Sequence, residues 1–229
     1  MPDLPPSPVR HLPMKPFYRA CRQWLLDWFR LLNGLTVSGQ EHIPTEGPFL
    51  LACNHASFLD PPVFAAACPR ELHFFARKTL WKGSFGTLIT NLNAIPIDRD
   101  GERDLEAFRR VFSTLKDGES LLVFPEGTRT DDGSLHDGKK GVGLIACRAQ
   151  APVAPARIFG SYEMWNRHHK LPRLTKPLGV AFGPMIPADV YDPGKTDPDR
   201  YQTAANRIMQ AIGQLEDPRN LDRAGQRAV

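Results

Sequence analysis

Along most of this chain, short hydrophobic runs alternate with stretches in which hydrophobic positions recur every three or four residues. Such runs are typical of buried strands, and the wider spacing is typical of amphipathic helices. We expect strands at 49–53, 72–76, 94–97, 120–124, 153–158 and 178–182, and helices at 61–67, 79–92, 105–115, 140–150 and 200–215. Strands alternating with helices predict an α/β fold, a single-domain sandwich with a largely parallel central sheet.

A further helical pattern precedes this domain, from Pro16 to about Asn33, and Gly34 ends it. Its hydrophobic residues share one face and its polar residues another, with Leu26 as the one misplaced apolar residue. The apolar face comprises Phe17, Cys21, Trp24, Leu25, Trp28, Phe29 and Leu32, and the polar face comprises Arg19, Arg22, Gln23 and Arg30. Such a helix either lies in a membrane interface or packs on the protein's own core, and periodicity leaves both open.

We therefore divide the chain into four parts: a proline-rich disordered segment (1–15), an amphipathic helix (16–34), the α/β domain (35–216) and a polar tail (217–229). A length of 229 residues suits one domain with a sizeable core. The segment 1–13 holds five prolines and no apolar run, so no signal peptide is expected. No stretch reaches the ~18 apolar residues that a spanning helix requires.

Charge and cysteine content narrow the class of protein further. The net charge of +4 is modest, and no cluster of basic and aromatic residues resembles a nucleic-acid-binding motif, so nucleic acid is not an expected partner. The four cysteines have no metal-ligand spacing, and a chain of this size needs no disulfide framework. We expect reduced cysteines, no metal and no bound cofactor.

Two short segments carry the candidate chemistry: residues 54–60, which read Asn-His-Ala-Ser-Phe-Leu-Asp, and residues 124–130, which read Phe-Pro-Glu-Gly-Thr-Arg-Thr. Histidine titrates near neutrality and suits a general base, and Asp60 can orient His55 and stabilise its cation. On one ideal helix these two side chains would diverge by about 140°. We therefore expect His55 on a loop and Asp60 near the start of the next helix.

Each of these residues also has a structural interpretation. Asp60 precedes Pro61, which is a common pairing at a helix start, and Ser57 with Asp60 resembles a capping box. Arg129 offers a fork of donors that matches phosphate oxygens, but a surface ion pair is the alternative. Gly127 allows the backbone to approach a ligand closely. The other six histidines have no such companions, and we interpret them as structural or solvated.

All these segments resemble motifs of the lysophospholipid acyltransferase family. The first matches its Asn-His-x-Ser-x-x-Asp block, and the second matches Phe-Pro-Glu-Gly-Thr-Arg-Ser with Thr130 in place of serine. Residues 95–99, Ile-Pro-Ile-Asp-Arg, resemble the arginine-bearing block, and residues 151–155, Ala-Pro-Val-Ala-Pro, resemble a fourth and weaker one. The four blocks occur in the family's order, and the resemblance covers roughly residues 40–185.

The resemblance implies an O-acyltransferase that moves a fatty acyl group from acyl-CoA or acyl-carrier protein to a lysophospholipid, most simply 1-acylglycerol-3-phosphate. It implies His55 and Asp60 as the catalytic pair, and an acceptor site formed by Arg99, Glu126, Gly127, Thr128 and Arg129. It favours a membrane role for the N-terminal helix, with the enzyme peripheral on the cytoplasmic face. Another lyso-lipid acceptor, such as a lyso-ornithine lipid, and a non-catalytic lipid-binding protein remain the alternatives.

Overall fold

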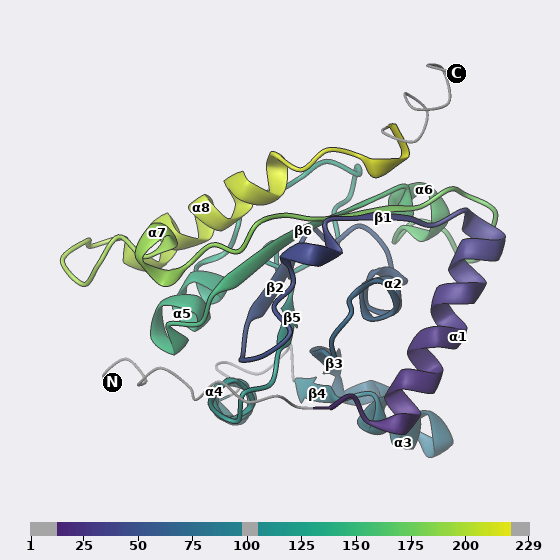
Figure 1. Ribbon diagram of the computed structural model, residues 1–229, viewed down its shortest axis with the longest axis horizontal. Helices are drawn as coiled ribbons and strands as arrows, with labels where there is room; N and C mark the ends of the chain where they lie inside the picture. The colour runs from purple at the N-terminus through teal and green to yellow at the C-terminus, as the bar shows by residue number, and fades with distance from the viewer. Residues whose placement is uncertain (1–12, 98–104, 221–229) are drawn as a thin grey trace.

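A seven-stranded sheet runs through the centre of the computed structural model, which describes residues 13–97 and 105–220 (Figure 1). The strand order is β1-β7-β6-β2-β5-β3-β4. All neighbouring pairs are parallel except β6 and β7. The largely parallel sheet predicted from the sequence is thus confirmed. The strands are β1 (Thr36–Ser38), β2 (Leu50–Cys53), β3 (His73–Arg77), β4 (Ala94–Ile97), β5 (Leu121–Val123), β6 (Val153–Phe159) and β7 (Gly179–Phe182).

Helices cover both faces of this sheet and give it two cores. Successive side chains of a strand point to opposite faces, and in β2 Leu51 and Cys53 join the core that α1 and α2 cover. Leu50 and Ala52 join the core that α4, α5 and α8 cover. The main helices are α1 (Pro16–Asn33), α2 (Asp60–Ala67), α3 (Gly83–Asn91), α4 (Leu105–Lys116), α5 (Lys140–Ala149) and α8 (Arg200–Gly213).

The ends of the parallel strands place the two motif segments side by side. β2 pairs with β5 on one side, where Ala52 lies opposite Val123, and with β6 on the other. The residues that follow β2 and β5 therefore emerge at the same edge of the sheet. In open α/β sheets ligands bind outside the carboxyl ends of the strands. The segments 54–60 and 124–130 lie at this edge.

The N-terminal helix α1 packs on the core and also presents an apolar stripe to solvent. Leu26 and Phe29 are buried in the core shared with α2, so Leu26 is not misplaced as the face assignment from the sequence had it. Arg22, assigned to the polar face, donates from Nε to the carbonyl oxygen of Cys68 at the end of α2, at 2.6 Å. Phe17, Trp24, Leu31 and Leu32 remain exposed.

Other boundaries differ from the predicted ones. The predicted helix 79–92 is a 3₁₀ turn, η2 (Lys78–Leu80), followed by α3, which begins at Gly83 with φ +54°. The sequence pattern did not predict β1, the 3₁₀ turn η1 (Gln40–His42), or the short helices α6 (Ser161–Trp165) and α7 (Ala188–Tyr191). These elements are three to five residues long, too short for a periodic pattern to register.

Several expectations concern the chain ends. Residues 1–12 of the proline-rich segment, residues 98–104 and residues 221–229 of the tail lie outside the described residues. The start of the tail packs on the domain, because Arg219 binds Asp217 and donates from Nη1 to the carbonyl oxygen of Pro177 at 2.8 Å.

The four cysteines are free. Among the described helices, none combines the length and hydrophobicity needed to cross a bilayer.

Candidate active site

His55 lies on the loop that links β2 to α2, as predicted, and it is 8% exposed. Its Nδ1 lies 2.8 Å from Oδ2 of Asp60, the first residue of α2. The imidazole also stacks on the ring of Phe124, with centroids 4.0 Å apart and planes 15° apart. These contacts hold the ring in one orientation, and Nε2 has no hydrogen-bond partner among the described residues.

The carboxylate of Asp60 serves the loop rather than the helix. It is fully buried, and the same Oδ2 accepts hydrogen bonds from the backbone N–H groups of Ala56 and Ser57, at 2.6 and 2.7 Å. Leu59 is the N-cap residue of α2, and no side chain caps that helix. Because Oδ2 accepts hydrogen bonds from two backbone N–H groups, it carries no proton of its own. The hydrogen between Oδ2 and His55 therefore belongs to Nδ1. The neutral ring then carries its lone pair on Nε2.

Two further side chains fix the loop to its surroundings. Asn54 forms a two-way contact with β6: its Nδ2 donates to the carbonyl oxygen of Ile158, and the N–H of Ile158 donates to its Oδ1, at 3.2 and 2.8 Å. Ser57 donates from Oγ to the carbonyl oxygen of Trp165 at 2.8 Å and accepts from the N–H of Leu59. Of the capping box that their spacing resembles, only the hydrogen bond from the N–H of Ser57 to Asp60 forms, because Oγ of Ser57 accepts from Leu59 and not from Asp60.

The second segment binds both polar groups of the His55 peptide. Oε1 of Glu126 accepts from the N–H of His55 at 3.0 Å, and the N–H of Thr130 donates to the carbonyl oxygen of His55 at 2.8 Å. Glu126 is 3% exposed, and its Oε2 is buried with no hydrogen-bond partner among the described residues. Burial raises the pKa of Glu126 to about 7. One carboxylate oxygen thus holds the histidine loop.

Gly127 and Thr128 form the exposed part of the second segment. The N–H of Gly127 closes a turn on the carbonyl oxygen of Phe124 at 2.9 Å, and Gly127 has φ +69°. A side chain there would be strained by the backbone and would also meet the Lys139 side chain at 3.0 Å. Glycine is therefore strongly favoured at this position, and the residue is exposed to solvent.

Arg129 lies over the ring of Phe58, with Cζ 3.4 Å from the ring centroid. This cation–π contact joins the second segment to the loop of the first. The predicted site thus gathers residues from both segments, including His55, Asp60 and Glu126. Arg99, the remaining predicted acceptor residue, lies outside the described residues.

Arg167, which no motif had indicated, stabilises the second segment through hydrogen bonds to Thr128 and Arg129. Its Nη2 donates to Oγ1 of Thr128 at 2.8 Å and to the carbonyl oxygen of Arg129 at 2.6 Å. Its Nη1 donates to Oδ1 of Asp131 at 2.7 Å. Arg167 follows α6 and is distant in sequence, so nothing local to residues 124–130 could have identified it.

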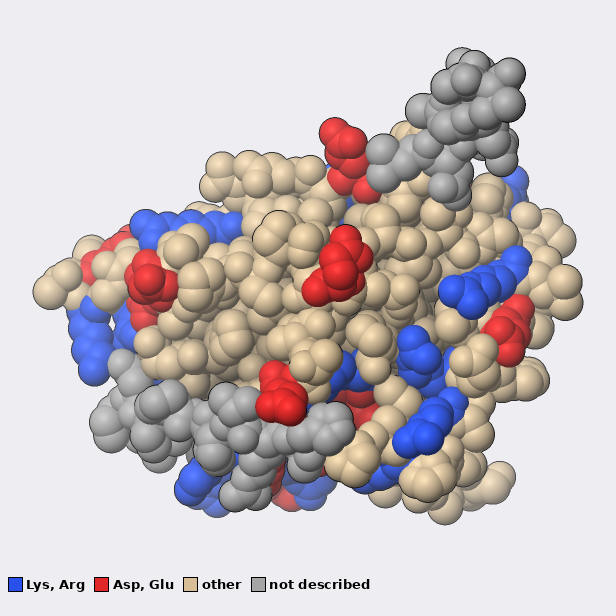
Figure 2. All heavy atoms as spheres, viewed as in Figure 1, with Lys and Arg blue, Asp and Glu red and all other residues tan. Residues whose placement is uncertain are grey.

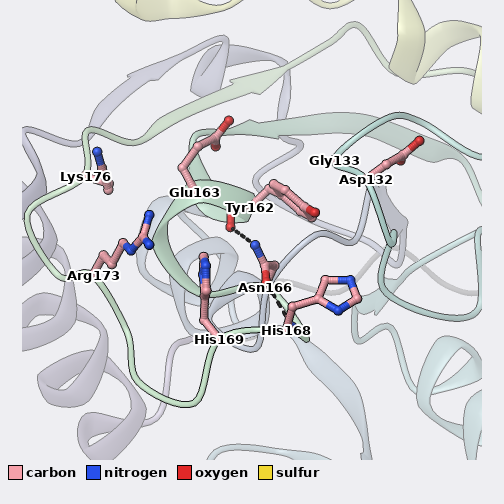
Figure 3. A pocket seen from close by; sticks show the side chains of 9 residues that line it. All are labelled: Asp132, Gly133, Tyr162, Glu163, Asn166, His168, His169, Arg173 and Lys176. Atoms are coloured by element: carbon pink, nitrogen blue, oxygen red, sulfur yellow. Dashed lines mark hydrogen bonds between the residues drawn. The ribbon is translucent and has the colours of Figure 1, made fainter.

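A cavity of about 490 Å³ opens between α6 and the loop that follows it (Figure 3). His169, Arg173 and Lys176 line one side of the cavity, with Glu163 above them in this view. None of the predicted site residues that the structure describes lines this cavity. Its charged lining suits a hydrophilic group better than an acyl chain.

Comparison with known proteins places the chain in a family. A family model described as Acyltransferase matches residues 34–159. The 1-acyl-sn-glycerol-3-phosphate acyltransferase of Bacillus subtilis is 30% identical over 204 residues, which are 87% of this chain and 97% of that protein. The human 1-acyl-sn-glycerol-3-phosphate acyltransferase alpha is 34% identical over 193 residues, 82% of this chain and 66% of that protein.

The crystal structure of the 1-acyl-sn-glycerophosphate (LPA) acyltransferase PlsC from Thermotoga maritima has a similar fold. The TM-score is 0.69 at 22% identity, and the match covers 87% of this chain and 81% of that one. At this identity the likeness supports the fold alone. The family model and the two relatives show that the chain is an O-acyltransferase and belongs to the 1-acylglycerol-3-phosphate acyltransferase-like family.

Proposed function

We propose that this enzyme transfers a fatty acyl group from an acyl thioester to the free hydroxyl of a lysophospholipid. The proposed acceptor is 1-acylglycerol-3-phosphate, and the product is then phosphatidic acid. The observation that carries the proposal is the His55–Asp60 pair, whose geometry leaves Nε2 as the proton acceptor. The names of the Bacillus and human relatives support the choice of acceptor.

In the proposed reaction the acceptor hydroxyl oxygen attacks the thioester carbonyl carbon while Nε2 of His55 removes the hydroxyl proton. The tetrahedral intermediate then collapses, the carbon–sulfur bond breaks, and the imidazolium returns the proton to the leaving thiolate. Asp60 stays ionised and stabilises the imidazolium between these steps. No protein nucleophile is needed, because the substrate's own hydroxyl forms the new ester bond.

Arg129 is the proposed partner of the acceptor phosphate among the described residues, and Arg99 is proposed as a second cation. The contact of Arg129 with Phe58 holds the guanidinium beside the histidine loop. A charge-assisted hydrogen bond to phosphate is worth about 1.5–3 kcal/mol. Glu126 supports this site by holding the N–H of His55 through Oε1. Gly127 and Thr128 line this acceptor site in the proposal.

The acyl donor is either acyl-CoA or acyl-carrier protein, and a donor-by-acceptor activity matrix tests the function. Thiol release is measured with each donor against 1-acylglycerol-3-phosphate, another lysophospholipid and a phosphate-free lyso-lipid such as a lyso-ornithine lipid. We expect the highest kcat/KM with 1-acylglycerol-3-phosphate. A preference for a phosphate-free acceptor would reject the proposed substrate. Lipid binding with no thiol release from any pair would favour the non-catalytic alternative.

We further propose that α1 attaches the enzyme peripherally to the cytoplasmic face of the membrane. The exposed stripe of Phe17, Trp24, Leu31 and Leu32 supports this role, with Arg19 and Arg30 exposed on the same helix. Aromatic and apolar side chains enter the interface while cations pair with anionic headgroups. Figure 2 shows blue cationic side chains over the side of the molecule where α1 lies.

Point variants test this attachment better than deletion, because deletion of α1 would remove Leu26 and Phe29 from the core. The variant Trp24→Ser with Leu31→Ser should bind vesicles containing phosphatidylglycerol at least ~10-fold more weakly, since two large apolar side chains leave the interface. Its Tm and its activity on a short-chain, water-soluble acceptor should match the wild type. Undiminished co-sedimentation of this variant with vesicles would reject α1 as the attachment.

A further inference from the structure

A second group of large apolar side chains is exposed on η2 and α3. Leu80 is 43% exposed, Phe85 is 50% exposed and Leu88 is 39% exposed. Phe85 and Leu88 lie three residues apart on α3, so they share one side of the helix. Gly86 and Ile89 are the buried residues of α3. Isolated exposed apolar residues are common on soluble proteins. A second observation is therefore needed before these three side chains indicate a binding surface.

The charged side chains on η2, on α3 and on the strands β3 and β4 that flank them are all cationic. Arg77, Lys78 and Lys82 are exposed and lie within or beside η2. From residue 72 to residue 97 the sequence contains no Asp or Glu. Exposed apolar side chains among cations, without acids, match the chemistry of an anionic lipid surface, where the chains enter the interface and the cations meet phosphates.

This surface continues the exposed stripe of α1. Nζ of Lys15, the N-cap residue of α1, donates to Oδ1 of Asn93 just after α3, at 3.0 Å. Glu71 joins the same two residues, because its carboxylate accepts from the N–H of Lys15 and from Nδ2 of Asn93. Figure 1 shows α3 beside the N-terminal end of α1, and Figure 2 shows cations gathered at the same corner. The N-terminal end of α1, which includes Phe17, and the C-terminal end of α3 are therefore neighbours.

The same surface borders the candidate active site. β3 and β4 are parallel to β5, so Arg77 at the end of β3 emerges at the edge of the sheet where His55 and residues 124–130 lie. The narrow apolar stripe of a single amphipathic helix only weakly restrains rocking of the domain about the helix axis. A second contact at a fixed position removes that freedom and sets which edge of the sheet faces the lipid.

We propose that η2 and α3 form a second lipid-contact surface, defined by Leu80, Phe85 and Leu88 with Lys78 and Lys82, which binds anionic bilayers together with α1. With both contacts made, the active-site edge faces the headgroups and lyso-lipid enters from the bilayer. The second step rests on the proposed function, whereas bilayer binding by this surface does not.

Co-sedimentation with phosphatidylcholine vesicles, with and without phosphatidylglycerol, tests the surface in the absence of substrate. The double variant Phe85→Ser with Leu88→Ser should bind the anionic vesicles on the order of 10-fold more weakly than the wild type. Lys82→Ala should lose about 5-fold on anionic vesicles and change nothing on neutral ones. Val190→Ser is the matched control, because Val190 is 55% exposed on α7, at the far side of the molecule in Figure 1.

Activity on a short-chain, water-soluble acceptor and the Tm are measured for each variant. We expect both to stay at the wild-type values while activity on bilayer substrate falls. Wild-type binding to anionic vesicles by both the double variant and Lys82→Ala would overturn the proposal, as would a wild-type protein that binds neither vesicle. If the double variant unfolds, Lys82→Ala alone decides. Vesicle binding that depends on α3 in a protein inactive on every acceptor would retain this surface and reject the proposed function.

Discussion

Replacement of Asp60 by Asn tests the side chain that orients His55. The change keeps the shape of the side chain and removes its charge. Oδ2 accepts three hydrogen bonds, from Nδ1 of His55 and from the N–H groups of Ala56 and Ser57. Because two backbone N–H groups need an acceptor, Asn keeps its carbonyl oxygen at the Oδ2 position and places its amide nitrogen at the buried Oδ1 position, where Asp60 has no hydrogen-bond partner among the described residues. The neutral side chain then no longer stabilises the imidazolium that forms when Nε2 of His55 removes the acceptor proton.

The expected losses in the free energy of unfolding and in kcat follow from these contacts. A hydrogen bond to a charged group contributes about 1 kcal/mol more than one between neutral groups. Three such bonds therefore predict a loss on the order of 3 kcal/mol in the free energy of unfolding. The same substitution in a Ser-His-Asp triad lowers kcat about 10⁴-fold, equivalent to about 5 kcal/mol of transition-state stabilisation. We expect kcat to fall by ~10³–10⁴-fold, with little change in the acceptor KM.

The assay follows thiol release under saturating donor and acceptor, with thermal unfolding measured on the same preparations. Asp117→Asn is the matched control, since Asp117 is an exposed carboxylate that accepts from Ser113 near the end of α4. A lower Tm with kcat within about threefold of wild type would mean that Asp60 only holds the loop. The reasoning from the charge of Asp60 to turnover would then be refuted.

Three further substitutions test the second segment. Arg129→Ala should raise the acceptor KM about 10–100-fold with little change in the donor KM, and an equal loss with a phosphate-free acceptor would show that Arg129 does not recognise phosphate. Arg167→Ala should raise the acceptor KM about 10-fold, because Thr128 and the carbonyl of Arg129 lose their support; unchanged kinetics would exclude that support. Glu126→Gln keeps an oxygen that can accept from the N–H of His55 and replaces the titratable carboxyl group with a neutral amide. Because burial raises the pKa of Glu126 from 4.5 to about 7, the folded chain holds this proton more tightly than the unfolded chain, so wild-type stability falls as pH rises across that interval. The Tm of Glu126→Gln minus that of wild type should therefore increase from pH 4.5 to 7 and then level off, whereas a difference independent of pH would contradict the assignment.

The position of His55 could be predicted because the signal is local. An apolar run ends at Cys53, and the five-residue spacing to Asp60 excludes a shared helix face, so the loop placement follows from the sequence. The role of Asp60 could not be separated from capping in the same way. Asp before Pro begins a helix in either case, and only the direction of the carboxylate, toward the N–H groups of Ala56 and Ser57, decides between them.

Other features depend on contacts that periodicity does not register. In α1 a core-facing side and an exposed apolar side are adjacent, so the hydrophobic pattern merges them and leaves Leu26 apparently misplaced, although it is buried. Arg167 reaches Thr128 and Arg129 only through the fold. The link between Glu126 and the peptide of His55 likewise requires β2 and β5 to be neighbours, which no local pattern specifies.

The turnover of His55→Ala tests the central claim, that the imidazole is the general base of an acyl transfer to 1-acylglycerol-3-phosphate. The measurement compares kcat for thiol release by wild type, His55→Ala and the control His42→Ala, a half-buried histidine in η1 that lies outside both motif segments. We predict a fall of ~10²–10⁴-fold for His55→Ala, with a cooperative unfolding transition retained and wild-type turnover in the control. A value for His55→Ala within about threefold of wild type would contradict general-base catalysis by this residue.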